Sequence, residues 1–465
     1  MTERDPYWQA RDGLERWSGA PLARADTWSW AQPDGIFRPT SPAWNTALGL
    51  GHDGFGVAGI ALIGALGMAA YFVVAILVSR RLGARALPTL ATTALVALLA
   101  LPMVSPRATI VIEAMLLLTL LLGHALITRP LPRQWWAFAG AAAAGAALGW
   151  AGAWLHVSWS VTALGLAAGL PLLAVLAGAS RWRVGLAATL GSGLAVGSLL
   201  GPFRWSVWQL LADIGSASGG QVVEWLSPFT GGLRLRWLPV ASLCLVLVAV
   251  CAVRLLRHRT GARGSAERAR WALEVLLVVI ALLATLAGLI AIRFLGVAAL
   301  TLLPVLAAEL SEATVRWRAR PSMPATVRTR LTAGYWRPIL TGVAVLLLPL
   351  AVVASNAPGR PSPAAEVVDG LPPSCRLFTD PDTAGVALLL RPDVKVWIDM
   401  RTEVYGAAAY SQVRERLLSS TAVSLPEGAT CAVVPTTAST VHVDASPDAP
   451  WTRSTTREGL SVWLP

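Results

Sequence analysis

The chain has 465 residues, of which 55% are hydrophobic and only 14% are charged, and its formal net charge is +12. A soluble domain normally carries about a quarter charged residues, so this composition excludes a protein that faces only water. The positive charge does not indicate nucleic-acid binding, because the arginines stand in short clusters between apolar runs and not along one continuous basic face. We therefore expect a membrane protein without a nucleic-acid partner.

The first 54 residues contain no apolar run long enough to cross a membrane, and they are rich in tryptophan: Trp8, Trp17, Trp28, Trp30 and Trp44. The segment 7–17 has apolar residues on one side of a short predicted helix. Trp8 and Trp30 can belong to an aromatic belt at the membrane surface, where tryptophan concentrates. Alternatively, they form a wall against a sugar or a lipid-linked substrate.

Residues 55–354 contain the predicted membrane spans. A helix needs about 20 mostly apolar residues to cross the hydrocarbon core. About ten runs meet or approach this length: 55–78, 86–104, 108–128, 136–154, 158–179, 184–201, 237–256, 271–292, 294–310 and 338–354.

The placement of arginine predicts the orientation, since cytoplasmic loops carry an excess of basic residues. One set of loops holds most of the arginines, at 80–85, 129–133, 181–183, 254–270 and 316–337. The opposite loops hold few, and this difference places residues 1–54 and 355–465 on the extracytoplasmic side of the plasma membrane. Residues 1–54 contain no signal peptide. Either this tail crosses unaided, or the natural protein begins upstream with one more helix, which we favour.

The residues after the last span predict a small α/β domain at 355–465, which opens with a Pro-rich linker at 355–363. Strand-like runs occupy 375–379, 394–399, 431–435 and 460–465, and 402–420 has a helical pattern. The predicted fold is thus mainly α, a polytopic transmembrane helical bundle with this C-terminal domain. An extracytoplasmic position permits a disulfide between Cys375 and Cys431, whereas Cys244 and Cys251 lie in an apolar run.

Short motifs follow one another in order along the chain: ERDPYWQARDG at 3–13, DTWSW at 26–30, Trp44, SPR at 105–107, WLHVS at 154–158, LGPF at 200–203, VEWLSP at 223–228, AIRF at 291–294 and VWIDMRTEVYG at 396–406. Together they resemble a bacterial family of multi-spanning proteins related to the GT-C glycosyltransferases. Departures from the family pattern are Glu3 for Asp, Gln9 for His, Met400 for Gly and the absent opening helix. A metal-assisted form of the first loop would lose a ligand at Gln9, so we expect no bound metal and no other cofactor.

The resemblance implies that a carboxylate of the first outer loop takes a proton from an acceptor hydroxyl, and the matching residue is Asp5. Asp26 is the second catalytic candidate. A positioned base is typically worth 10²–10⁴ in rate. The alternatives are that Asp5 is a solvated acid near a helix start and that Asp26 is a turn or cap residue.

Four polar residues map to the outer ends of the predicted spans: Arg107, His156, Glu224 and Arg293. Polar groups at this depth line a cavity or pair with one another. The guanidinium groups match the phosphate of a lipid-linked donor. Alternatively, they bind lipid headgroups or pair with Glu224, and His156 is a satisfied hairpin residue.

Three further residues are secondary candidates. Glu113 lies inside the predicted span 108–128 and must face protein or water. Asp399 and Arg401 follow a predicted strand, where binding residues often lie, or they pair and fix the turn between strand and helix.

Three functions remain open. The first is a glycosyltransferase whose partners are membrane lipid, a polyprenyl-phosphate-linked sugar and an envelope glycan or glycoprotein acceptor. The second is a non-catalytic scaffold or accessory protein of envelope assembly. The third is a transporter, supported by Glu113 and the number of helices.

Overall fold

The computed structural model describes residues 5–31, 35–100, 107–131, 133–218, 222–258, 264–318, 363–418, 422–444, 451–457 and 459–465. The predicted span at 338–354 and nearly all of the predicted linker lie outside these residues. The chain forms two compact units. The first comprises Met1–Gly64, Ser206–Val223 and Asn356–Pro465, and the second comprises Ala65–Trp205 and Glu224–Ser355.

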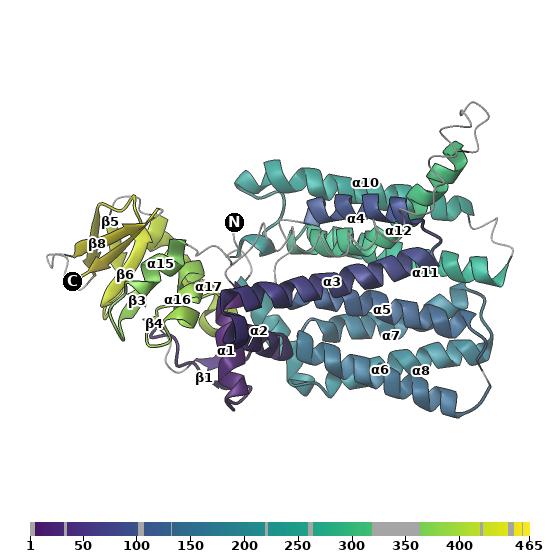
Figure 1. The fold of residues 1–465 in the computed structure, drawn as a ribbon, viewed down its shortest axis with the longest axis horizontal. Coiled ribbons are helices and arrows are strands. Elements are labelled where there is room, and N and C mark those ends of the chain that lie inside the picture. The colour runs from purple at the N-terminus through teal and green to yellow at the C-terminus, as the bar shows by residue number, and fades with distance from the viewer. Residues whose placement is uncertain are drawn as a thin grey trace. The chain divides into compact units, whose positions relative to one another are not determined.

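Long apolar helices make up most of the second unit (Figure 1): α3 (Val57–Arg81), α4 (Ala86–Ala100), α5 (Ala108–Thr128), α6 (Trp136–Leu155), α7 (Trp159–Leu176), α8 (Arg181–Leu199), α10 (Arg234–His258), α11 (Ser265–Gly288) and α12 (Arg293–Arg318). Short 3₁₀ turns occupy Arg204–Ser206 (η1), Val223–Trp225 (η2) and Gly231–Leu233 (η3).

Within the described residues, seven helices are long and apolar enough to cross a membrane, and an eighth span results if α8 and the following Arg204–Ser218 count as one broken span. The chain is therefore a multi-pass membrane protein, as predicted. The number is lower than the predicted ten for three reasons. The structure describes only Ala86–Ala100 of the predicted span 86–104, and it does not describe the run at 338–354. The predicted span 184–201 corresponds to α8, which counts only as half of the broken span.

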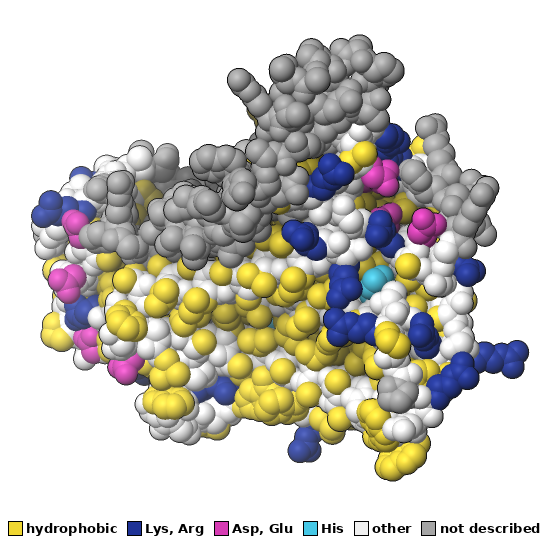
Figure 2. Space-filling model, turned by 45° about the vertical axis from the view of Figure 1, so that its right-hand side comes forward, with side chains coloured by type: hydrophobic (Ala, Val, Ile, Leu, Met, Phe, Trp, Pro, Cys, Tyr) yellow, Lys and Arg dark blue, Asp and Glu magenta, His cyan; other side chains and the backbone are white. Residues whose placement is uncertain are grey.

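Large apolar side chains are exposed along the helices, among them Leu66, Leu77, Leu172 and Leu283. Figure 2 shows such side chains spread over the helices, with dark-blue Lys and Arg side chains gathered near their right-hand end. An apolar surface of this extent is expected on a protein whose solvent is lipid.

Glycine-rich packing explains why α6 has so few large side chains. A Cβ on Gly145 would come within 2.2 Å of the Leu190 carbonyl oxygen, and one on Gly149 within 2.1 Å of the Leu194 carbonyl oxygen. Such small residues at four-residue spacing allow two helix backbones to approach closely inside a membrane. The Gly-rich sequence of α6 is thus a packing surface for α8.

The first unit is a mixed α/β structure. Its helices are α1 (Asp5–Trp17), α2 (Pro42–Phe55), α9 (Val207–Ser218), α15 (Pro363–Asp369), α16 (Pro381–Leu390) and α17 (Thr402–Leu418). Its strands are β1 (Arg24–Ala25), β2 (Ile36–Phe37), β3 (Arg376–Phe378), β4 (Lys395–Val396), β5 (Ala422–Leu425), β6 (Cys431–Pro435), β7 (Thr440–Val443), β8 (Thr452–Arg457) and β9 (Leu460–Leu464).

The main sheet has the strand order β4-β3-β6-β9-β8. The pairs β4/β3 and β3/β6 are parallel, while β6/β9 and β9/β8 are antiparallel. Strands β1 and β2 form a small antiparallel pair, and β5 and β7 form a separate parallel pair. The predicted α/β domain at the C-terminus is therefore present, with a mixed sheet.

An N-terminal segment extends this sheet at its β4 edge. Ser29 pairs with Val396 in a parallel bridge. The Trp30 N–H donates to the Val396 carbonyl at 3.0 Å, and the Val396 N–H donates to the Trp28 carbonyl at 2.9 Å. The sequence predicts separate domains at 1–54 and 355–465, whereas the structure joins these segments, together with α9, in one compact unit.

A disulfide between Cys375 and Cys431 links the segment before β3 to the start of β6, with the two Cα atoms 6.0 Å apart. Because β3 and β6 are neighbours in the sheet, the disulfide covalently links two adjacent strands at the centre of the sheet. Cys244 and Cys251 are free and buried in α10.

Candidate functional site

Four polar residues gather at one end of the helices in the second unit. Arg107 precedes α5, Arg293 is the first residue of α12, and His156 stands in the tight turn between α6 and α7. Glu224 lies in η2. Successive helices run in opposite directions, so these starts and ends fall at the same end of the bundle.

Glu224 joins the two arginines. Arg107 donates from Nη1 to Glu224 Oε2 at 2.5 Å, and Arg293 Nη1 lies 3.6 Å from Glu224 Oε1. The Arg293 guanidinium also stacks over the Trp225 ring, 4.5 Å from its centroid. About a quarter of each of these three charged side chains remains exposed, 21%, 27% and 23% for Arg107, Glu224 and Arg293.

Hydrogen bonds hold the Glu224 segment in place. The Ile292 N–H donates to the Leu226 carbonyl at 3.1 Å, and the Ser227 hydroxyl donates to the Leu289 carbonyl at 2.8 Å. These bonds tie the residues after η2 to the turn between α11 and α12. Glu224 and Arg293 are therefore held by one connected piece of backbone.

His156 is neutral in this environment. Its Nδ1 accepts the Ser158 backbone N–H at 3.0 Å, which leaves the proton on Nε2. Burial, together with the positive charges of Arg293 and Arg107, lowers the pKa of His156 to about 3. Burial opposes ionisation of Glu224, but Arg107 and Arg293 outweigh this effect and lower its pKa. Two guanidinium groups, one carboxylate and one neutral imidazole leave an excess positive charge.

We call these four residues the arginine cluster. The sequence predicts that they meet at one end of the spans, and the structure brings them together. A guanidinium offers several N–H groups in a fixed plane and binds phosphate in a bidentate way. Chemically, the arginine cluster is suited to hold a phosphate at the end of the helices.

A second polar group lies in the core of the first unit. Asp26 follows β1, Asp399 follows β4, and Arg401 immediately precedes α17, which carries Tyr405. Arg401 donates from Nε to both oxygens of Asp399, at 2.8 and 3.0 Å, and from Nη2 to Asp399 Oδ2 at 2.6 Å. Its Nη1 donates to Asp26 Oδ1 at 2.8 Å, and its Nη2 donates to the Tyr405 hydroxyl at 2.7 Å.

Aromatic rings and local turns complete this group. The Arg401 guanidinium lies 4.3 Å from the Trp28 ring centroid and 4.7 Å from that of Phe37. Asp26 Oδ1 also accepts the Trp28 backbone N–H at 3.2 Å, and Asp399 Oδ1 accepts the Arg401 backbone N–H at 2.9 Å. Burial disfavours the charged form of Asp26, but Arg401 outweighs it and lowers its pKa.

The geometry of Asp26, Asp399 and Arg401 favours the structural alternative for all three. Their side chains are almost completely buried. Both oxygens of Asp26 are within hydrogen-bond distance of Arg401 or Tyr405. A base must reach the hydroxyl that it deprotonates, and Asp26 is held instead inside an ion-paired turn.

Asp5 and Glu403 are two further carboxyl groups of the first unit, and both are only partly buried. Asp5 begins α1, is half-buried, and its Oδ1 accepts the Trp8 indole N–H at 3.3 Å. Glu403 lies in the first turn of α17, and its buried Oε1 has no hydrogen-bond partner among the described residues. Burial raises the pKa of Glu403 to about 7, and the charges of Asp399 and Asp5 contribute in the same direction.

Glu403 is the candidate that the sequence does not single out. It stands in RTEVYG, within the motif VWIDMRTEVYG at 396–406. The sequence shows an acidic residue at this position. It does not show that one oxygen of this carboxylate is buried, because burial depends on the folded chain.

Trp8 and Trp30 pack inside the first unit. Trp8 is buried, and its ring contacts Phe37 edge-on at a centroid distance of 6.2 Å. Trp30 donates its indole N–H to the Leu377 carbonyl at 3.3 Å and packs near Trp397. Both therefore contribute to the core of this unit.

Glu113 is buried in α5, and its carboxylate lies 3.5 Å from the Thr301 hydroxyl on α12. As expected for a carboxyl group at this depth, it faces protein. No group of three or more His, Cys, Asp or Glu side chains suited to a metal ion occurs within the described ranges.

No protein-family model matches the sequence, and no curated protein does. Solved structures do match. ArnT from Cupriavidus metallidurans bound to undecaprenyl phosphate has a TM-score of 0.56 at 15% identity, with 100% of this chain and 94% of ArnT covered. The Archaeoglobus fulgidus oligosaccharyltransferase tethered to an acceptor peptide has a TM-score of 0.55 at 13% identity, with 93% of this chain covered.

This chain spans 65% of the length of the archaeal oligosaccharyltransferase. At these identities the matches establish the fold and not the reaction. The chain has a GT-C-like fold, as the order of the motifs predicts.

Proposed function

We propose that this chain is a membrane glycosyltransferase that takes a sugar from a polyprenyl-phosphate donor and passes it to an envelope acceptor. The observation that carries the proposal is the arginine cluster, an excess of positive charge at the ends of membrane helices in a chain with a GT-C-like fold. Arg107 and Arg293 would bind the phosphate of the donor lipid. Glu224 would orient both guanidinium groups, and the neutral His156 would donate a hydrogen bond from Nε2 without adding charge.

Asp5 would act as the general base. In the proposed step, the Asp5 carboxylate accepts the proton of an acceptor hydroxyl while that oxygen attacks the anomeric carbon. The bond between this carbon and the phosphate oxygen breaks, and the electron pair leaves with the polyprenyl phosphate. The developing negative charge on the phosphate is then stabilised by the arginines, which is the usual role of such groups in phosphate-leaving reactions.

Glu403 would support Asp5 as a second carboxyl group. Burial raises the pKa of Glu403 to about 7, which suits a carboxyl group that exchanges protons near neutral pH. The proposal further places the first unit and the arginine cluster on the extracytoplasmic side, as the arginine-poor loops predict. Cysteine labelling of the intact cell at positions in the first unit tests that orientation.

Donor binding is the direct test. Purified full-length protein in detergent would be mixed with undecaprenyl phosphate, and the retained lipid quantified by native mass spectrometry. We expect Arg107→Gln and Arg293→Gln each to reduce retention about tenfold, because each loses a charge-assisted hydrogen bond to phosphate. Arg236→Gln is the matched control, since Arg236 is exposed near the start of α10 at the same end of the helices. Equal retention in all three variants would contradict the assignment.

A non-catalytic scaffold of envelope assembly is the second candidate. Its support is the engagement of Asp26 with Arg401, which removes one of two predicted catalytic acids from the reaction. Envelope glycans and lipid-linked sugars would be compared in cells that carry Asp5→Asn or Glu403→Gln. If both variants insert and fold but leave every glycan unchanged, the scaffold function is supported and the enzymatic one is rejected.

A further inference from the structure

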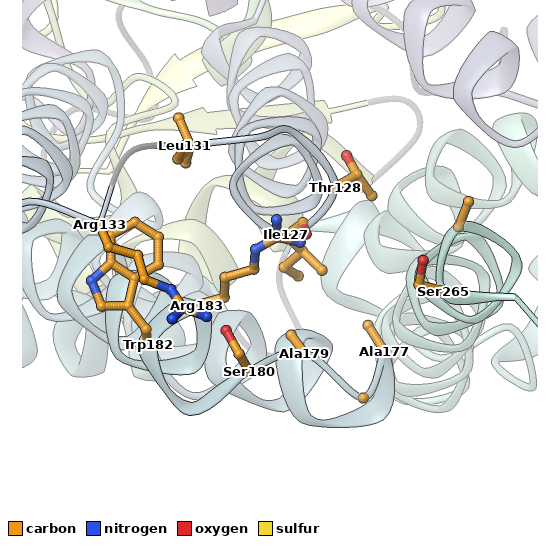
Figure 3. Close-up of a pocket in the computed structure, with 12 residues that line it drawn as sticks. Ile127, Thr128, Leu131, Arg133, Ala177, Ala179, Ser180, Trp182, Arg183 and Ser265 are labelled. Atoms are coloured by element: carbon orange, nitrogen blue, oxygen red, sulfur yellow. Dashed lines mark hydrogen bonds between the residues drawn. The ribbon is translucent and has the colours of Figure 1, made fainter.

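A second basic site lies at the opposite ends of the same helices. An open cavity of about 310 Å³ is lined by the end of α5, the turn from α7 to α8 and the start of α11. Figure 3 shows the side chains of Arg133, Ser180 and Arg183 directed into this space, with Trp182 beside Arg133. The arginine cluster stands at the first residues of α5 and α12, whereas this cavity stands at the last residues of α5, so the two sites are distinct.

The cavity is positively charged. Arg133 and Arg183 line it, and none of its twelve lining residues is acidic. The Arg268 guanidinium approaches the rim at Gly178, where an added Cβ would stand 3.0 Å from its Nη1. Glu267, the residue after the lining residue Ala266, is engaged at the start of its own helix, where it accepts the Gly264 N–H at 3.5 Å.

Arg183 is held in position by the backbone that ends α5. It donates to the Ile127 carbonyl, and its Nη2 donates to the Arg129 carbonyl at 3.3 Å. These bonds give Arg183 a structural role as a cap of α5, but they do not neutralise its charge. The guanidinium therefore stays fixed at the wall of the cavity as a permanent positive group.

The start of α8 adds to the positive potential. Ser180 is its N-cap residue and makes no side-chain cap hydrogen bond. The first N–H groups of a helix have no partner within the helix and favour negatively charged groups. The Ser180 hydroxyl and the first turn of α8 thus face the same cavity as the two arginines.

The surroundings of the cavity indicate a lipid. Helices α5, α7 and α11 are candidate membrane spans, so their ends lie at the depth of the lipid headgroups. Ile127, Leu131 and Trp182 supply apolar walls, and Trp135 and Trp136 are exposed at the start of α6. Tryptophan marks the membrane surface, and basic pockets between helix ends bind anionic headgroups. We propose that this cavity binds the phosphate of an anionic phospholipid headgroup.

Native mass spectrometry tests the proposal with the full-length protein in detergent and equimolar phosphatidylglycerol and phosphatidylcholine. Wild-type protein is expected to retain phosphatidylglycerol preferentially. The double variant Arg133→Gln, Arg183→Gln should lose this preference, by about fivefold for each arginine removed. The control double variant Arg80→Gln, Arg85→Gln removes two exposed arginines at the same ends of the helices and should keep it. Equal preference in the two double variants would overturn the proposal.

A second variant keeps the test decisive if loss of Arg183 destabilises the end of α5. Ser180→Asp places a carboxylate in the cavity while supplying a favourable N-cap residue, so the protein should fold. It is expected to repel the headgroup and abolish the preference, and full retention of phosphatidylglycerol by this variant would also overturn the proposal.

Competition with inorganic phosphate identifies the source of the ligand. Displacement only at millimolar phosphate supports a lipid ligand, whereas tight phosphate binding in the absence of lipid would replace it with a soluble anion.

Discussion

Arg401 donates a hydrogen bond from Nη1 to Oδ1 of Asp26 at 2.8 Å, although 375 residues separate them in the chain. Both side chains are nearly inaccessible, at 0% and 1% exposure. Arg401 also pairs with Asp399, so one buried cation is shared by two buried carboxyl groups. The N-terminal and C-terminal segments of the first unit therefore depend on one another through a single guanidinium.

Replacing the Arg401 guanidinium should strongly destabilise the first unit. Arg401→Met leaves Asp26 and Asp399 buried without a countercharge, and we expect a loss of about 3–5 kcal/mol in the free energy of unfolding. Arg457→Met is the control, because Arg457 forms an exposed pair with Glu366 at 4.0 Å and such pairs contribute less than about 1 kcal/mol. Chemical denaturation of the purified protein measures both. Similar losses in the two variants would show that the buried network does not stabilise the unit.

Glu403 should make stability depend on pH. Its pKa of about 7 in the folded protein lies above the ordinary value for glutamate, so the native state holds a proton that the unfolded state releases. Stability should therefore fall as the pH rises from about 4.5 to about 7 and then level off. Glu403→Gln removes the titrating proton and should flatten this part of the curve of unfolding midpoint against pH. An unchanged slope in this variant would assign the titration to another group.

His156 should respond in the opposite direction. Its folded pKa of about 3 lies below the ordinary value for histidine near 6.5, so the unfolded state binds the extra proton between these values. Its contribution to stability is complete above about pH 6.5 and is lost as the pH falls toward 3. Nitrogen NMR of histidine-labelled protein, assigned by comparison with His156→Asn, should show Nε2 protonated and Nδ1 bare at pH 7. A protonated Nδ1 would contradict the hydrogen bond from Ser158.

The disulfide between Cys375 and Cys431 should contribute about 2–4 kcal/mol, because it closes a loop of 56 residues in the unfolded chain. Cys375→Ser is expected to lower the thermal unfolding midpoint of the first unit. Cys251→Ser should change it little in comparison, since Cys251 is free and lies in α10. Reducing agent should reproduce the effect of Cys375→Ser in the wild-type protein and have no effect on that variant.

Hydropathy and arginine placement predict most of the helical fold, because both act over local stretches of sequence. The four members of the arginine cluster were predictable together for the same reason, since each marks the end of a span. The pairing of Asp26 with Arg401 was not, because no local pattern reports which residues meet across hundreds of positions. Asp26 and Arg401 belong to the motifs DTWSW and IDMRTEVYG, but the sequence of a motif does not indicate which other motif it contacts in the fold.

Glu403 shows another limit. Its partial burial arises only when α17 packs within the first unit, so its sequence resembles an ordinary helix start.

The bridge between Ser29 and Val396 also bears on the order of synthesis. The ribosome makes the partner of Ser29 only after every membrane helix of the second unit has been translated. Until then, the tryptophans around Ser29 have no sheet to cover them, and a nascent chain halted before Val396 would present them to chaperones and proteases. The first unit can therefore form only after the residues around Val396 have been translated.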